Sequence, residues 1–191
     1  MTTPENMPFR SPEELCARLA DLLPKGAHFC IGIDGMDGVG KSTLAREMVT
    51  RLGGSVISLD DHLTKKQNGY VLHIRRDEVN AALSASTSPI IIEGVCLLAV
   101  AHRCGFDVDV LVYVRRISRN SDIWHEEEEC MAQRPADELK EKARALRNAF
   151  LMADDSNIAA DDLGLMGELI DYHAQWRPVE RADFLFDVRC A

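Results

Sequence analysis

The stretch IGIDGMDGVGKSTLAREM, residues 31–48, constrains the fold of this chain more than any other part of it. Isoleucines first alternate with small residues, then glycines gather over a few positions, and a helix-forming segment follows. Gly35, Gly40, Lys41 and Ser42 fit the pattern GxxxxGK(S/T), the P-loop motif. A strand that passes through a glycine-rich turn into a helix is a site for anions, because loop N–H groups and the helix N-terminus face the same space.

The side chains of the P-loop suit a nucleoside triphosphate. Lys41 can reach the β- and γ-phosphates, the Ser42 hydroxyl can ligate Mg²⁺, and Thr43 can bond an α-phosphate oxygen. The glycines permit the unusual dihedral angles and the close backbone approach that a phosphate cradle needs. The sequence therefore predicts that ATP and Mg²⁺ bind through Gly35, Met36, Asp37, Gly38, Val39, Gly40, Lys41, Ser42 and Thr43.

Apolar strand-like segments alternate with helical ones along the chain. The predicted strands are 28–34, 55–61, 89–94, 107–115 and 182–188. Helices are predicted at 41–52 and 75–86, and in two or three pieces between about 121 and 176. Such alternation is typical of right-handed βαβ units and a parallel sheet. We expect an α/β P-loop NTPase fold, with a five-stranded parallel sheet sandwiched between helices.

The length of 191 residues suits one domain covering 1–191. Residues 1–26 are predicted to form an N-terminal helical extension, in which Ser11 is the N-cap and Glu14 completes a capping box. The region from about 115 to 150 is a candidate lid.

The composition excludes several classes of protein. A net charge of -9 argues against a nucleic-acid-binding protein, although a few Lys and Arg can still dominate a cleft that binds an anion. The most apolar run, PIIIEGVCLLAVA, is too short to cross a bilayer, and the N-terminus lacks an apolar leader, so no membrane partner is expected. Six cysteines without a CxxC pair favour a reduced, cytoplasmic protein. The sequence leaves the oligomeric state open.

Carboxylates follow three of the predicted strands. In parallel sheets ligands bind at the carboxyl ends of the strands, where Asp34, the pair Asp60 and Asp61, and Glu93 are all expected. Asp60 suits a base that accepts a proton from a hydroxyl facing the γ-phosphate, and Asp61 competes for this role. Glu93 ends a strongly apolar strand, where burying a carboxylate costs free energy unless the group has a binding partner.

Five motifs extend the pattern over residues 28–188: GIDGMDGVGKST, VISLDDHL, IIIEGV, DVLVYVRRISR and YHAQWRPVERADFLF. In this order they resemble the uridine kinase and phosphoribulokinase group of P-loop kinases. The resemblance implies that Asp60 is the catalytic aspartate and that Glu93 orients Mg²⁺-bound water or contacts substrate. It makes Ser42, Glu93 and Asp60 the candidate metal ligands, and it places Arg115, Arg116 and Arg119 on a lid, where Arg116 would act in catalysis.

Two features depart from the family pattern. The arginines follow Val114 directly, so either the lid is short or they lie at the strand end; rival lid cations are Arg134, Arg144 and Arg147. Segment 68–79 occupies the position of the family's acceptor-binding segment, but its sequence does not match the uridine kinase motif there. The candidate substrate residues are Asp61, Tyr70, His73 and Arg76. The acidic run HEEEEC, 125–130, is expected to be a solvent-exposed helix face.

These observations predict a kinase that moves the γ-phosphoryl group of ATP to a hydroxyl of a small metabolite, with a nucleoside or sugar-like acceptor as first choice. One alternative is a nucleoside monophosphate kinase of the thymidylate kinase type, for which Arg75 and Arg76 could bind an acceptor phosphate. The other is a non-kinase nucleotide-binding regulatory module, which needs no base on the acceptor side.

Overall fold

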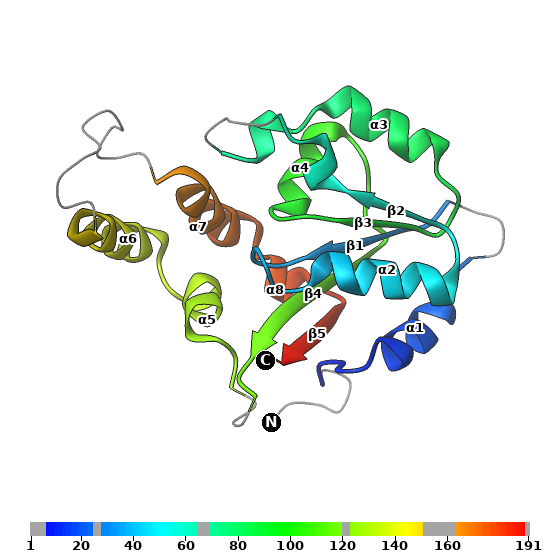
Figure 1. Cartoon of the computed structure of the whole chain (residues 1–191), viewed down its shortest axis with the longest axis horizontal. Helices are drawn as coiled ribbons and strands as arrows, with labels where there is room; N and C mark the ends of the chain where they lie inside the picture. Colours follow the sequence, from blue (N-terminus) through cyan, green and yellow to red (C-terminus); the bar gives the residue numbers. More distant parts are fainter. Residues whose placement is uncertain (1–6, 25–27, 65–68, 120–122, 151–162, 190–191) are drawn as a thin grey trace.

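A computed structural model describes residues 7–24, 28–64, 69–119, 123–150 and 163–189 (Figure 1). Its centre is one sheet of five parallel strands in the order β2-β3-β1-β4-β5. The strands are β1 (Cys30–Asp34), β2 (Ser55–Ser58), β3 (Ile90–Glu93), β4 (Val110–Ile117) and β5 (Phe184–Arg189). The prediction of a five-stranded parallel sheet is confirmed.

Helices cover the sheet on both faces. The helices are α1 (Pro12–Ala20), α2 (Lys41–Leu52), α3 (Arg76–Ala85), α4 (Leu97–Cys104), α5 (Glu126–Gln133), α6 (Ala136–Phe150), α7 (Gly164–Trp176) and α8 (Pro178–Arg181). Helices α1 and α2 pack together, whereas α4 contacts both α3 and α7. Gly32 of β1 faces Leu97 of α4, and a Cβ atom at Gly32 would lie 2.6 Å from the Leu97 side chain.

Local sequence explains the helix boundaries near the P-loop. The Ser11 hydroxyl accepts a hydrogen bond from the N–H of Glu14, so the predicted N-cap of α1 is confirmed. Helix α2 begins directly after Gly40, whose φ of 99° is left-handed, and it ends at Gly53. The core is formed by fully buried side chains of the central strands, Ile31, Ile33, Ile91, Ile92 and Val112.

Several elements differ from the prediction. Strand β2 ends at Ser58, and the 3-10 turn η2 (Leu59–His62) follows, so Asp60 and Asp61 leave the sheet direction at once. Strand β4 continues to Ile117 because its pairing with β5 extends that far. The apolar run after β3 forms α4, a helix that was not predicted from the sequence.

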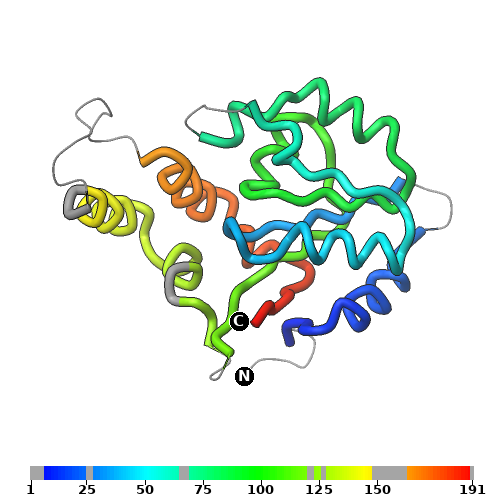
Figure 2. The backbone as a smooth tube through the Cα atoms, in the orientation of Figure 1, coloured from blue at the N-terminus to red at the C-terminus, as the bar shows by residue number. Residues whose placement is uncertain are grey.

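The candidate lid region forms α5 and α6, which extend away from the sheet beyond the end of β4 (Figure 1). At the other end of the chain, the first described residues run beside β5 (Figure 2). There Phe9 forms a parallel bridge with Phe186. No helix within the described ranges is long and apolar enough to cross a membrane.

Candidate active site

The P-loop connects β1 to α2 through a backbone that only glycine adopts easily. Gly35, Gly38 and Gly40 have φ angles of 148°, 70° and 99°. At Gly35 a side chain is also excluded by space, because a Cβ atom there would lie 2.6 Å from the carbonyl oxygen of Val114. The glycine burst in the sequence therefore corresponds to real conformational and steric demands.

The Lys41 side chain lies across this loop. Its Nζ donates hydrogen bonds to the carbonyl oxygens of Gly35 (3.1 Å) and Met36 (2.7 Å), and the residue is only 7% exposed. Burial lowers the pKa of Lys41, while the charges of nearby carboxylates, Asp34 and Glu93 above all, act in the opposite direction. The ammonium is thus enclosed among the acidic groups that the sequence places at strand ends.

Glu93 at the end of β3 is joined to the P-loop. Its Oε1 accepts hydrogen bonds from the hydroxyls of Ser42 (3.0 Å) and Ser58 (2.6 Å), and the side chain is buried. This places the candidate metal-binding hydroxyl of α2 and the carboxylate of β3 in direct contact. Ser58, at the end of β2, was not identified from the sequence.

Asp60 lies in η2, beside the loop that follows β3. The Tyr70 hydroxyl donates a 2.6 Å hydrogen bond to Asp60 Oδ1. Gly94 makes this approach possible, since a Cβ atom there would lie 2.9 Å from the Tyr70 hydroxyl oxygen and 2.8 Å from Leu59. The two residues therefore have separate roles. Glu93 accepts a hydrogen bond from Ser42 of the P-loop, and Gly94 leaves room for the Tyr70 side chain.

Segment 69–73 is held in place by α7. Glu168 accepts a hydrogen bond from the N–H of Tyr70 and a second, of 2.8 Å, from that of Val71. These backbone groups would otherwise lack a partner within the turn, so Glu168 fixes the position of Tyr70 and, through it, the orientation of Asp60. No local pattern around Glu168 signals this contact.

The donor set fits Mg²⁺. Ser42 and Glu93 supply oxygen ligands, and Asp60 lies in the turn that follows the neighbouring strand β2. Hard cations such as Mg²⁺ prefer oxygen ligands. Within the described part of the chain no group of three or more His, Cys, Asp or Glu side chains forms a cage for a metal. The Ser42 hydroxyl and the Glu93 carboxylate suit Mg²⁺, which usually keeps several waters and binds through one or two protein groups plus phosphates.

Asp34, the last residue of β1, holds the start of the P-loop in place. It is buried, its Oδ1 accepts a 2.7 Å hydrogen bond from the N–H of Gly35, and its Oδ2 accepts one from the Tyr172 hydroxyl. The same hydroxyl accepts the N–H of Leu98 at 3.2 Å. Burial raises the pKa of Asp34 to about 6, although the Tyr172 and Gly35 hydrogen bonds and the Lys41 charge lower it.

This raised pKa predicts a pH dependence of stability. The folded protein holds a proton on Asp34 more tightly than the unfolded chain, so the contribution of Asp34 to the free energy of unfolding falls as pH rises from 3.8 through about 6. Asp34→Asn is expected to remove this part of the slope in urea titrations made at several pH values, whereas Asp21→Asn on the exposed end of α1 retains it. Parallel profiles for Asp34→Asn and the unmodified protein would contradict the assignment.

The Tyr-His pair of α7 supports the sheet rather than a ligand. His173 is buried, and its Nδ1 donates to the Leu169 carbonyl at 2.8 Å, so Nε2 accepts from the Tyr113 hydroxyl at 2.8 Å. Burial lowers the pKa of His173, which keeps the ring neutral and suited to this role.

The remaining acceptor-side candidates are more scattered. Asp61 is exposed in η2, and its carbonyl accepts a hydrogen bond from Arg75. His73 ends the turn η3 (Val71–His73), where its N–H donates to the Tyr70 carbonyl at 3.0 Å. Arg76 begins α3, and its guanidinium approaches Gly105 at the far end of α4. Asp61 thus shares the turn of Asp60, His73 is bonded to the backbone of Tyr70, the partner of Asp60, and the Arg76 guanidinium faces the end of α4.

The predicted lid arginines begin inside the sheet. Arg115 and Arg116 belong to β4, so the second of the two sequence-based alternatives, a position at the strand end, is the correct one. Arg115 binds Asp187 of β5 with N–O distances of 2.8 and 2.7 Å. Arg116 binds Glu128 of α5 at 2.6 Å, and a catalytic role for Arg116 stays a prediction.

The expectation that the acidic run 125–130 faces solvent is wrong for Glu128, which is fully buried. Its carboxylate accepts the N–H and the Nε of Arg116, and the Trp124 indole N–H at 3.0 Å. These three donors offset the cost of burying the charge. Of the rival lid cations, Arg134 pairs with Glu138 at 2.6 Å, and Arg144 and Arg147 lie on α6.

A solved structure shares this arrangement. A possible uridine kinase from Bacillus stearothermophilus matches with a TM-score of 0.52 at 17% identity, over 92% of this chain and 97% of that chain. The chain therefore has an α/β P-loop NTPase fold. A candidate fructose transport system kinase from Silicibacter sp. TM1040 has a TM-score of 0.43 at 15% identity, over 95% of this chain and 99% of that chain. No protein-family model and no curated protein matches the sequence. The P-loop fold is therefore shared, and function has to be argued from the residues.

Proposed function

We propose that the protein transfers the γ-phosphoryl group of Mg-ATP to a hydroxyl of a small metabolite, with a nucleoside or sugar-like acceptor. The observation that carries the proposal is the contact between Ser42 of the P-loop and Glu93 of β3 beside the Tyr70-bound Asp60. A nucleotide-binding module needs the P-loop alone. A carboxylate fixed on the acceptor side of that loop is what phosphoryl transfer to a hydroxyl adds.

Each group has a role that follows from its position. Lys41 neutralises charge on the phosphates, and Ser42 with Glu93 holds the metal and its water shell. Asp60 accepts the proton of the acceptor hydroxyl, and Tyr70 keeps the Asp60 carboxylate oriented through the 2.6 Å hydrogen bond. Bound Mg-ATP supplies the phosphoryl group and the metal charge. Catalysis would then rest mainly on positioning and electrostatic stabilisation.

The surroundings of Asp60 support a neutral acceptor over a nucleoside monophosphate. Arg75 donates to the carbonyls of Asp61 and His62 and pairs with Glu78 at 2.8 Å. Arg76 is directed towards Gly105. The two arginines that could bind an acceptor phosphate thus have other neighbours. The solved structure with the TM-score of 0.52 is described as a possible uridine kinase, which is consistent with an uncharged acceptor.

An acceptor panel tests the proposal. ATP consumption is measured with nucleosides, sugars, pantothenate-like compounds and nucleoside monophosphates, each with Mg²⁺. We expect consumption only with a hydroxyl acceptor that carries no phosphate. Turnover with monophosphates alone would instead identify the thymidylate-type alternative, and acceptor-independent hydrolysis would identify a regulatory module.

A further inference from the structure

Glu128 of α5 is a fully buried carboxylate at the end of β4. Its oxygens accept the N–H of Arg116 at 2.9 Å, the Nε of Arg116 at 2.6 Å, and the Trp124 indole N–H at 3.0 Å. Two of these three donors belong to one residue. Because the same carboxylate holds both the backbone and the side chain of Arg116, it fixes the direction in which the guanidinium leaves the strand.

The Glu128 carboxylate lies along the edge of β4 that the P-loop also contacts. Pairing of β1 with β4 ends at Tyr113, and the P-loop follows at once: a Cβ atom at Gly35 would lie 2.6 Å from the Val114 carbonyl oxygen. Backbone groups two residues apart on a strand face the same edge, so the Arg116 N–H faces this edge as well. Glu128 accepts that N–H and therefore lies just beyond the start of the P-loop.

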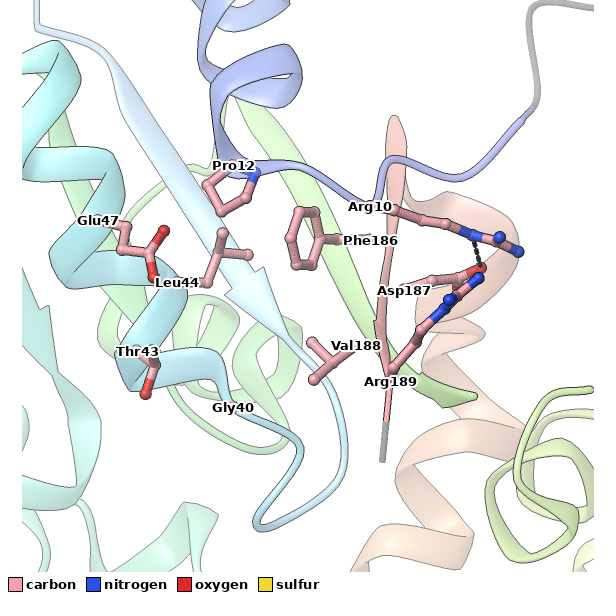
Figure 3. Close-up of a pocket in the computed structure, with 10 residues that line it drawn as sticks. All are labelled: Arg10, Pro12, Gly40, Thr43, Leu44, Glu47, Phe186, Asp187, Val188 and Arg189. Atoms are coloured by element: carbon pink, nitrogen blue, oxygen red, sulfur yellow. Dashed lines mark ion pairs between the residues drawn. The ribbon is translucent and has the colours of Figure 1, made fainter. Parts of the chain in front are cut away.

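Two further observations agree with this position. Met36 of the P-loop and Met131 of α5 line one cavity. Arg116 pairs with Val188 of β5, and paired residues of a parallel ladder present their side chains on the same face of the sheet. The Val188 side chain lies 3.8 Å from the place of a Cβ atom at Gly40, at the end of the P-loop (Figure 3). Arg116 is thus directed to the face on which the P-loop enters α2.

The segment that carries Glu128 is also attached to β4 by contacts that do not involve Arg116. Trp124 forms a bridge with Ile117, the last residue of β4. The Arg115 guanidinium lies 5.1 Å from the centre of the Trp124 ring and pairs with Asp187 at 2.7 Å. Attachment of α5 therefore does not by itself explain why a carboxylate is buried beside Arg116.

We propose that Glu128 is a positioning residue, which holds the Arg116 guanidinium towards the transferring phosphoryl group. This inference rests on the proposed function, in which Arg116 would contact the phosphates. A guanidinium binds phosphate oxygens through charge-assisted hydrogen bonds, and it stabilises transition-state charge best when its direction is fixed before the reaction. A buried carboxylate near bound phosphates is unfavourable by itself, so the cation that it orients accounts for its presence.

The test measures kcat and KM for Mg-ATP, with the acceptor of the panel that gives the highest turnover. We expect Arg116→Met to lower kcat about 10²-fold and Glu128→Gln to lower it about tenfold, with KM changed less than about threefold. If Glu128 acts through Arg116, the double variant loses no more kcat than Arg116→Met alone. Glu129→Gln is the matched control, because it removes the same charge from the same helix at a side chain that contacts Gln133 instead. It should keep full activity.

A milder variant protects the test against misfolding of Glu128→Gln. Trp124→Phe retains an aromatic ring for Arg115 and removes the indole donor from Glu128. It should lower kcat about two- to fivefold, and only while Arg116 is present.

The outcomes separate the inference from the proposed function. Full kcat in Glu128→Gln would overturn the inference, and so would an equal fold-loss with and without the Arg116 guanidinium, which is the result expected if Glu128 only stabilises α5. The proposed function stands in both cases. If the unmodified protein turns over no acceptor of the panel, the proposed function fails, and the inference falls with it.

Discussion

Lys41→Met is expected to reduce phosphoryl transfer by about 10²- to 10³-fold, the cost of removing one group that stabilises transition-state charge. Methionine retains a flexible apolar stem in a position that is only 7% exposed, so the change is mainly the loss of the ammonium. The same loss weakens Mg-ATP binding, because Nζ is the cation lying across the loop carbonyls of Gly35 and Met36. Turnover and calorimetric affinity measure the two effects.

A second effect distinguishes Lys41 from a surface lysine. Its charge lowers the pKa of the buried Asp34, so Lys41→Met is expected to raise that pKa further and to lower stability at neutral pH. Lys142→Met on the exposed surface of α6 is the matched control and should alter neither turnover nor melting temperature. Normal activity in Lys41→Met would refute the role of the P-loop, and the proposed kinase function with it.

Asp60→Asn is expected to lower kcat by about 10²- to 10⁴-fold, the usual contribution of a general base, while Mg-ATP affinity changes little. The amide oxygen can still accept the Tyr70 hydrogen bond that holds the side chain at 2.6 Å, so the geometry of the site is retained. Single-turnover kinetics with the best acceptor from the panel, together with calorimetry, separate the chemical step from binding.

The neighbouring Asp61 provides the sharpest comparison for Asp60. Both aspartates lie in η2, but only Asp60 receives the Tyr70 hydroxyl among the hydrogen bonds of the described residues. If Asp61→Asn abolishes turnover and Asp60→Asn does not, the base is Asp61. Asp77→Asn, in the exposed first turn of α3, controls for the loss of one negative charge and is expected to keep full activity.

Local structure could be predicted from the sequence where neighbouring residues alone determine the backbone conformation. The glycines of the P-loop, the Ser11 N-cap and the isoleucine-rich strand β3 are such cases. Predictions were wrong where a partner from elsewhere decides the outcome. Pairing with β5 extends β4 to Ile117, past the predicted end at residue 115. Arg116 permits the burial of Glu128, which an acidic run by itself argues against.

The sequence by itself determined the alternation of strands and helices, the phosphate-binding turn and the acids that follow β2 and β3. It could do so because dihedral preferences and hydrophobic periodicity are properties of neighbouring residues. Only the tertiary structure joined Tyr172 to Asp34 and Glu168 to Tyr70, residues 138 and 98 positions apart. It alone also brought Phe9 beside Leu185 and Asp187 of β5. Such contacts arise because packing around one sheet satisfies buried polar groups with whichever side chains the fold brings near, and sequence separation does not limit that choice.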